Sequence, residues 1–136
     1  MKLKALAEDE FQIVAVMRGD QCPAEEFILT GEKSTKASRD GLMEMIKVVA
    51  RVGLDGVPSA WTHEASKRDH IYEFIKGPLR LFFFKGLDKQ IAVCTSGTRK
   101  SGDKADKALV AKAAKLREAY LHARANNTCE VIDEIE

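Results

Sequence analysis

Residues 71–95 read IYEFIKGPLRLFFFKGLDKQIAVCT, and this stretch decides the fold. It contains three apolar runs, 71–75, 79–84 and 91–95, which are rich in the β-branched and aromatic residues typical of strands. A Gly-Pro pair follows the first run and the segment KGLD follows the second, so both connections read as short turns. Strands joined by short turns pair antiparallel, and the stretch therefore predicts a three-stranded meander.

The residues before the meander predict one more strand and two helices. Residues 11–17 (FQIVAVM) read as a strand covered on both faces. Pro23 suits the first turn of a short helix that continues with Glu25 and Glu26, whose carboxylates the positive helix end favours. A second helix is indicated by apolar residues at helical spacing and ends at Gly53; these residues are Leu42, Met45, Ile46 and Val49.

Two further segments complete the predicted fold. Residues 54–69 have no sustained period and predict a long loop, in which Trp61 plugs the edge of the core. After the meander, an apolar stripe with basic residues opposite predicts an amphipathic helix that Asp103 could cap. The stripe comprises Ala105, Leu109, Ala113, Leu116 and Tyr120. We therefore expect a single α+β domain over residues 1–136, in which an antiparallel sheet packs against two N-terminal helices with a C-terminal helix.

Charge is distributed unevenly along the chain, although 22 basic and 21 acidic residues leave a net charge of only +1. Residues 1–60 carry 8 basic and 10 acidic side chains, whereas residues 61–125 carry 14 basic and 7 acidic ones, a balance of +7. Because the local field rather than the total charge attracts a phosphate backbone, nucleic acid is a reasonable partner.

Several classes of protein are disfavoured by what the sequence lacks. The start, MKLKALAEDEF, places three acidic residues before any apolar core of signal-peptide length, and no run approaches the roughly 20 apolar residues of a membrane span. We expect a cytoplasmic protein with no membrane partner. The three cysteines form no CxxC pair and read as reduced thiols, and His63, His70 and His122 share no ligand spacing, so no metal is expected. Nucleotide-binding and serine-hydrolase motifs are missing, and we expect no cofactor.

An arginine interrupts the most apolar run of the chain. The two-residue period of a strand puts Arg80 on the same face as Phe82 and Phe84. A guanidinium there needs either an acid or an anionic ligand, because burying it alone is costly. One interpretation is a structural cross-strand pair with Glu73 on the neighbouring strand, and the other is a phosphate clamp. The phenylalanines of this run are expected in the core, although one or two on an exposed sheet face could stack a base.

More cations follow the third strand. Arg99 and Lys100 stand in a Ser/Thr/Gly-rich segment that would let a ligand approach the backbone, and Lys104 comes soon after. If the third strand lies beside the Arg80 strand, the pair leaves the sheet at the end where Lys76 also sits. We therefore expect Arg80, Arg99 and Lys100 to converge as one anion site, with Lys76 and Lys104 nearby.

The ordered motifs resemble a known family. They are IYEF at 71–74, RLFFF at 80–84, IAVC at 91–94 with the Arg99-Lys100 pair, an Ala-rich basic helix ending at Tyr120, and CPAEEF at 22–27. This series resembles the HigB-like, phage-derived branch of the RelE/ParE toxin superfamily, in which an LWEL strand, an RxxxF strand and a strand leading to a Lys-Lys pair precede a helix of the form A…R…Y. The resemblance covers about residues 11–124.

The resemblance implies a RelE-like fold and the toxin of a type II toxin–antitoxin pair. Such a toxin is a metal-independent endoribonuclease that cuts mRNA, free or on the ribosome, inhibits translation and is bound by a small helix-turn-helix or helical antitoxin. The family's strand arginine, a phosphate stabiliser, corresponds to Arg80, and its basic pair corresponds to Arg99 and Lys100. The resemblance therefore implies that these three residues are catalytic. It also implies an RNA-binding role for Lys76, Lys104 and Thr95. Attack of the ribose 2′-OH on the adjacent phosphate would need a base, an acid and cations on the phosphorane.

Two departures keep alternatives open. Many relatives have a histidine where Thr95 stands and an aromatic residue near Gly97. A lysine or arginine poised by neighbouring cations could take over proton transfer. The ParE branch instead poisons DNA gyrase by binding, and a third alternative is an inactive phage relic that only binds RNA or its partner. Fold does not separate these functions.

The last eleven residues, 126–136, form an acidic tail with four carboxylates and no base. The favoured interpretation is a frayed, solvated terminus. The alternative, suggested by Val131, Ile132 and Ile135, is that the tail lies against the sheet or the basic helix and partly occupies the RNA site.

Overall fold

The computed structural model describes residues 1–100, 102 and 106–132. Within these residues one sheet has the strand order β3-β4-β5-β6-β2-β1-β7. Its strands are β1 (Lys2–Glu8), β2 (Gln12–Val16), β3 (Thr62–Ser66), β4 (Ile71–Lys76), β5 (Leu79–Phe84), β6 (Gln90–Arg99) and β7 (Glu130–Ile132). The helices are α1 (Pro23–Leu29), α2 (Lys36–Val52) and α3 (Lys107–Ala125). The chain is an α+β protein.

The sheet is mixed and not purely antiparallel. The predicted meander is confirmed, because β4 pairs antiparallel with β5 and β5 with β6. However, β2 pairs with β6 in parallel, and β7 pairs with β1 in parallel. The antiparallel sheet expected from the sequence is corrected in this respect: a strand that precedes the helices returns to the middle of the sheet beside the last strand of the meander.

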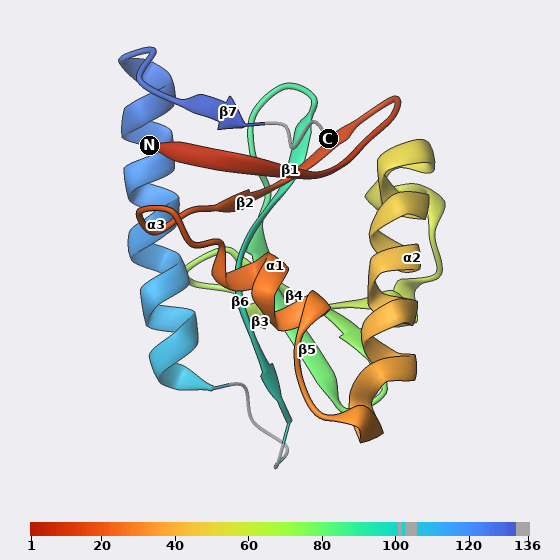
Figure 1. Cartoon of the computed structure of the whole chain (residues 1–136). Helices are drawn as coiled ribbons and strands as arrows, with labels where there is room; N and C mark the ends of the chain where they lie inside the picture. Colours follow the sequence, from red (N-terminus) through yellow and green to blue (C-terminus); the bar gives the residue numbers. More distant parts are fainter. Residues whose placement is uncertain (101, 103–105, 133–136) are drawn as a thin grey trace.

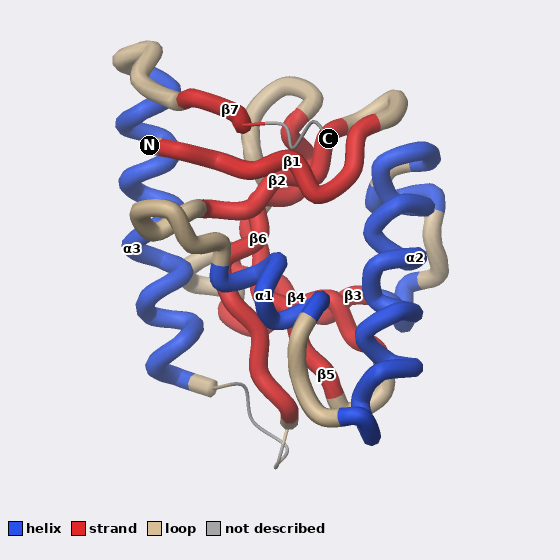
Figure 2. Tube along the Cα trace, in the orientation of Figure 1, coloured by secondary structure: helices blue, strands red, loops and turns tan. Residues whose placement is uncertain are grey.

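Helices cover both faces of the sheet (Figures 1 and 2). Helices α1 and α2 pack on the face that carries Leu81 and Phe83, and α3 packs on the face that carries Phe82 and Phe84. These four side chains of β5 are buried, which confirms the core role predicted for the aromatic run. Alternation along one strand therefore supplies both halves of the core.

The elements with a strong apolar signal form as predicted. In β2, residues 13–16 are buried, as expected for a strand covered on both faces. Helix α2 buries Leu42, Met45, Ile46 and Val49 and ends at Gly53, whose φ of 86° suits glycine. Trp61 packs against the core at its edge.

Three strands, β1, β3 and β7, carry too little apolar signal to be predicted. Strands β3 and β7 are the two edges of the sheet, and β1 lies next to β7. The loop expected over 54–69 contains the polar edge strand β3, so that prediction is wrong for residues 62–66. Strand β1 has one large buried residue, Leu3, and a bulge between Ala5 and Ala7 then interrupts its alternation. The Lys4 ammonium lies 2.6 Å from the Glu25 carboxylate of α1.

Helix α3 begins at Lys107, and the Asp106 side chain accepts a hydrogen bond of 3.0 Å from the Leu109 N–H. The cap is therefore Asp106, and the expected helix start at Ala105 and cap at Asp103 lie outside the described residues. The helix buries Ala113 and Tyr120 from the predicted stripe. No helix in the described ranges combines the length and the apolar character needed to cross a membrane.

The described part of the acidic tail is ordered as β7, which contradicts the favoured prediction of a frayed terminus for residues 130–132. Val131 lies opposite Leu3 of β1 and is half-buried. Three strands, β6, β2 and β1, separate β7 from the Arg80 strand. This segment therefore does not occupy the Arg80 site, and residues 133–136 lie outside the described chain.

Candidate nucleic-acid interface

Arg80 lies near the start of β5, and its side chain leaves the sheet on the α3 side, as Phe82 does. Its Nη1 donates hydrogen bonds to the backbone carbonyls of Gly77 (2.8 Å) and Leu79 (2.9 Å). Its Nε is buried and has no hydrogen-bond partner. No carboxylate of the described chain pairs with this guanidinium, so an uncompensated positive charge and a buried unsatisfied donor remain.

The structural pair between Arg80 and Glu73 does not form. Glu73 is buried and instead lies 2.9 Å from Nδ1 of His63 on the edge strand β3. His63 and Glu73 are direct partners in the β3–β4 ladder, which explains why their side chains meet. The interpretation in which Arg80 forms a structural cross-strand pair with Glu73 is therefore wrong.

The register of the meander divides the predicted cations between two faces. Lys76, Leu79 and Arg99 form one row across β4, β5 and β6. Residues in one row share a face, and Leu79 alternates with Arg80, so Lys76 and Arg99 leave the sheet on the α1/α2 side. A Cβ added at Gly41 of α2 would meet the aliphatic stem of Lys76, which shows that this lysine lies against that helix.

The expected convergence of Arg80 with the basic pair is therefore only partial. The four cations Lys76, Arg80, Arg99 and Lys100 lie at one end of the sheet, as predicted. However, Arg99 is exposed on the opposite face from Arg80. Lys100 continues the ladder, since its N–H donates to the Pro78 carbonyl (2.7 Å), and alternation returns its side chain to the Arg80 face. Lys104 lies outside the described residues.

Thr95 belongs to a β-bulge on the Arg80 face. Leu81 pairs with Gly97 and Phe83 with Cys94, so both Thr95 and Ser96 stand opposite the single residue Phe82. Thr95 is buried, and its hydroxyl donates to the Phe82 carbonyl at 3.4 Å. Surface hydroxyls on this face come instead from the half-buried Ser96 and from Thr98, which is the ladder partner of Arg80.

Helix α3 contributes one further cation, Lys112, beside the bulge. A pocket of about 120 Å³ between α3 and the end of β2 is lined by residues that include Arg18, Thr95, Ser96 and Lys112. We define the α3-side polar surface as Arg80, Ser96, Thr98, Lys100 and Lys112. It presents hydroxyl and cationic donors and no carboxylate of its own, which suits an anionic ligand with several phosphate oxygens.

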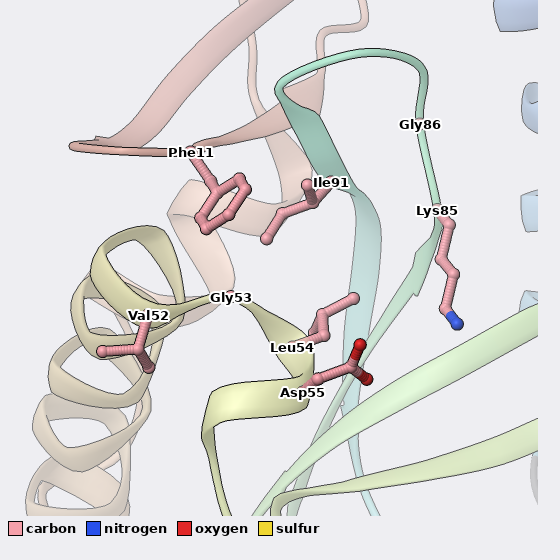
Figure 3. Close-up of a pocket in the computed structure, with 8 residues that line it drawn as sticks. All are labelled: Phe11, Val52, Gly53, Leu54, Asp55, Lys85, Gly86 and Ile91. Atoms are coloured by element: carbon pink, nitrogen blue, oxygen red, sulfur yellow. The ribbon is translucent and has the colours of Figure 1, made fainter.

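A larger pocket, of about 340 Å³, lies elsewhere (Figure 3). The side chains of Phe11, Leu54 and Ile91 point toward one another there, and Asp55 and Lys85 also line it. It sits where β5 ends and β6 begins, whereas Arg80 stands at the start of β5. This pocket is therefore separate from the α3-side polar surface.

The cysteines do not provide a reactive group on the α3-side polar surface. Burial raises the pKa of the Cys94 thiol well above its usual range, and burial also raises the pKa of Cys22. Both are buried, and Cys129 is half-buried. In the ranges that the structure describes, no three His, Cys, Asp or Glu side chains gather to hold a metal ion.

The sequence analysis placed Ser96 and Thr98 in a segment that a ligand could approach, but it did not predict the pairing of His63 with Glu73. The signal for His63 would have been a hairpin register that sets it opposite Glu73, but the polar sequence of β3 gave no strand pattern. The bulge in β6 changes the face of the sheet on which Ser96 lies, and no sequence pattern indicates this bulge. A comparison with models of known protein families and a search of curated proteins each give no match to this chain.

Proposed function

We propose that this chain is an RNA-cleaving toxin of the RelE/HigB type, whose α3-side polar surface binds a phosphodiester of mRNA. One observation carries the proposal: the Arg80 guanidinium faces this surface with no carboxylate partner and with a buried, unsatisfied Nε. A charge of this kind is expensive to maintain without an anion. The resemblance of the ordered motifs to the toxin family supports the same assignment.

In this proposal Arg80 stabilises the charge that develops on the phosphate as the 2′-OH attacks. The carbonyls of Gly77 and Leu79 hold Nη1, so the guanidinium is oriented before the ligand arrives. Lys100 and Lys112 hold neighbouring phosphates of the strand. A helical antitoxin would bind this chain and block the surface.

The test is cleavage of a labelled RNA by the purified full chain, with and without ribosomes. We expect fragments with 2′,3′-cyclic phosphate ends. Arg80→Ala should lower the cleavage rate about 10²- to 10³-fold, the loss typical of one charge-stabilising donor, with nearly unchanged melting midpoint.

Arg99→Ala is the matched control, because it removes an arginine at the same end of the sheet from the other face. It should cleave like the unmodified chain. A parallel DNA gyrase supercoiling assay tests the alternative: inhibited supercoiling without any RNA cleavage would overturn the proposal in favour of a ParE-like poison.

A further inference from the structure

We propose that His63 is the general base of the proposed RNA cleavage and that Glu73 is its positioning residue. This inference rests on the proposed function and deepens it, because it supplies the proton acceptor for which position 95 has only a buried threonine. The two side chains come from neighbouring strands, β3 and β4, and meet as direct ladder partners.

The geometry of the pair is that of an oriented imidazole. His63 Nδ1 lies 2.9 Å from the Glu73 carboxylate, whose side chain is only 5% exposed, whereas the His63 side chain is 63% exposed. With Nδ1–H donated to the carboxylate, the lone pair of Nε2 points away from Glu73, as in a base held in one tautomer by an acid. A pair that served only to satisfy Glu73 would not need an exposed imidazole.

The pair lies on the same face as Arg80. Glu73 stands opposite Phe82, which packs on the α3 side, and Arg80 is two residues from Phe82 along β5. Two strand spacings and a shift of two residues put the Cα atoms of His63 and Arg80 about 12 Å apart. In this proposal the phosphate binds at the Arg80 guanidinium, near the Gly77 and Leu79 carbonyls, and the ribose extends from there toward His63.

In the proposed reaction His63 accepts the proton and Arg80 stabilises the charge on the phosphate. The 2′ oxygen of the ribose forms a bond to phosphorus as its proton passes to His63 Nε2, and the bond from phosphorus to the 5′ oxygen breaks. The leaving 5′ oxygen takes a proton from water, and the imidazolium later returns its proton to solvent. Products are a 2′,3′-cyclic phosphate and a 5′-hydroxyl end, and Arg80 carries the phosphate charge throughout.

The experiment measures kcat and KM for RNA cleavage by the full chain and its variants. His63→Gln should lower kcat about 10²- to 10⁴-fold with KM unchanged, because the side chain keeps a donor for Glu73 but no longer takes the proton. Glu73→Gln should lower kcat about tenfold or more, again without a change in KM. His122→Gln, which alters an exposed histidine on α3, is the matched control and should have no effect.

Chemical rescue separates catalysis from structure. Imidazole added to His63→Ala should restore a large part of the lost rate, which a structural role would not produce. An unmodified chain that cleaves RNA together with a His63→Gln variant that cleaves equally well would overturn this inference and leave the proposed function standing. An unmodified chain that binds RNA but never cleaves it would overturn both. Failure of imidazole to restore any rate to a folded His63→Ala chain would overturn the general-base role alone.

Discussion

The ring of Phe27 in α1 lies over Gly97 in β6, so closely that a Cβ added at residue 97 would overlap it. Gly97 shares its face with Leu81, beneath α1. The toxin family that the sequence resembles has an aromatic residue near this position, and this packing gives a physical reason for the difference. Here the aromatic ring comes from the helix above the strand, and the strand provides only the space for it.

Gly97→Ala tests this close approach. The added methyl group must displace the Phe27 ring, so we expect a loss of about 1–3 kcal/mol in the free energy of unfolding, as for other overpacked sites. Urea denaturation measures it. Gly102→Ala is the matched control, since no atom of the described residues lies within 4 Å of a Cβ at that glycine. Equal stability of both variants would mean that α1 does not rest on Gly97.

The kind of ligand that the site residues need was predictable from the sequence, but the face of the sheet on which each side chain lies was not. The sequence indicated that Arg80 needs an acid or an anion, and the missing partner in the structure keeps the anion interpretation. It did not indicate that the Arg99 side chain would project from the face of the sheet opposite to that of Arg80. That outcome depends on a bulge of one residue in β6, and such a bulge changes the face of each residue after it without any marker in the sequence.

At the scale of elements, apolar signal decided which strands could be predicted. Strands β2, β4, β5 and β6 lie within the sheet and are rich in buried residues, whereas β3 and β7 form its two edges. An edge strand has one neighbour, and polar or charged residues there discourage pairing with other chains. The features that protect an edge therefore also hide it from sequence patterns. The parallel pairing of β7 with β1 joins segments from the two ends of the sequence, a contact that no local pattern predicts.

A chain ending at residue 129 tests the contribution of β7. Its removal uncovers the edge of β1 and exposes Leu3, which Val131 faces across the ladder. We expect a loss of about 1–3 kcal/mol in the free energy of unfolding, on the order of one or two buried aliphatic side chains. A chain ending at residue 132 keeps the strand and is the reference for this comparison. Unchanged stability of the chain ending at residue 129 would show that β7 does not stabilise the sheet.

At the scale of the whole molecule, a net charge of +1 conceals two faces of different character. On α2, Lys36 pairs with Asp40 and Lys47 with Glu44. On α3, Lys112 and Lys115 are exposed, and neither forms an ion pair within the described chain. Cations whose field is not cancelled by a neighbouring acid attract a polyanion more strongly, so the α3 side should be the face that meets RNA.

Two double variants with the same change in net charge isolate this effect. Lys112→Gln with Lys115→Gln removes two charges from the α3 face, and Lys36→Gln with Lys47→Gln removes two from α2. Binding of single-stranded RNA should weaken steeply with salt, with a slope of log K against log salt of roughly −0.7 per phosphate contact. The α3 variant should lower the steepness by up to roughly 1.4, the contribution of two contacts, and the α2 variant should leave it unchanged. Fluorescence anisotropy across a salt series measures both slopes. Since the two variants have equal net charge, equal slopes would show that RNA senses only the total charge of the protein, and a slope near zero for the unmodified chain would count against nucleic acid as its ligand.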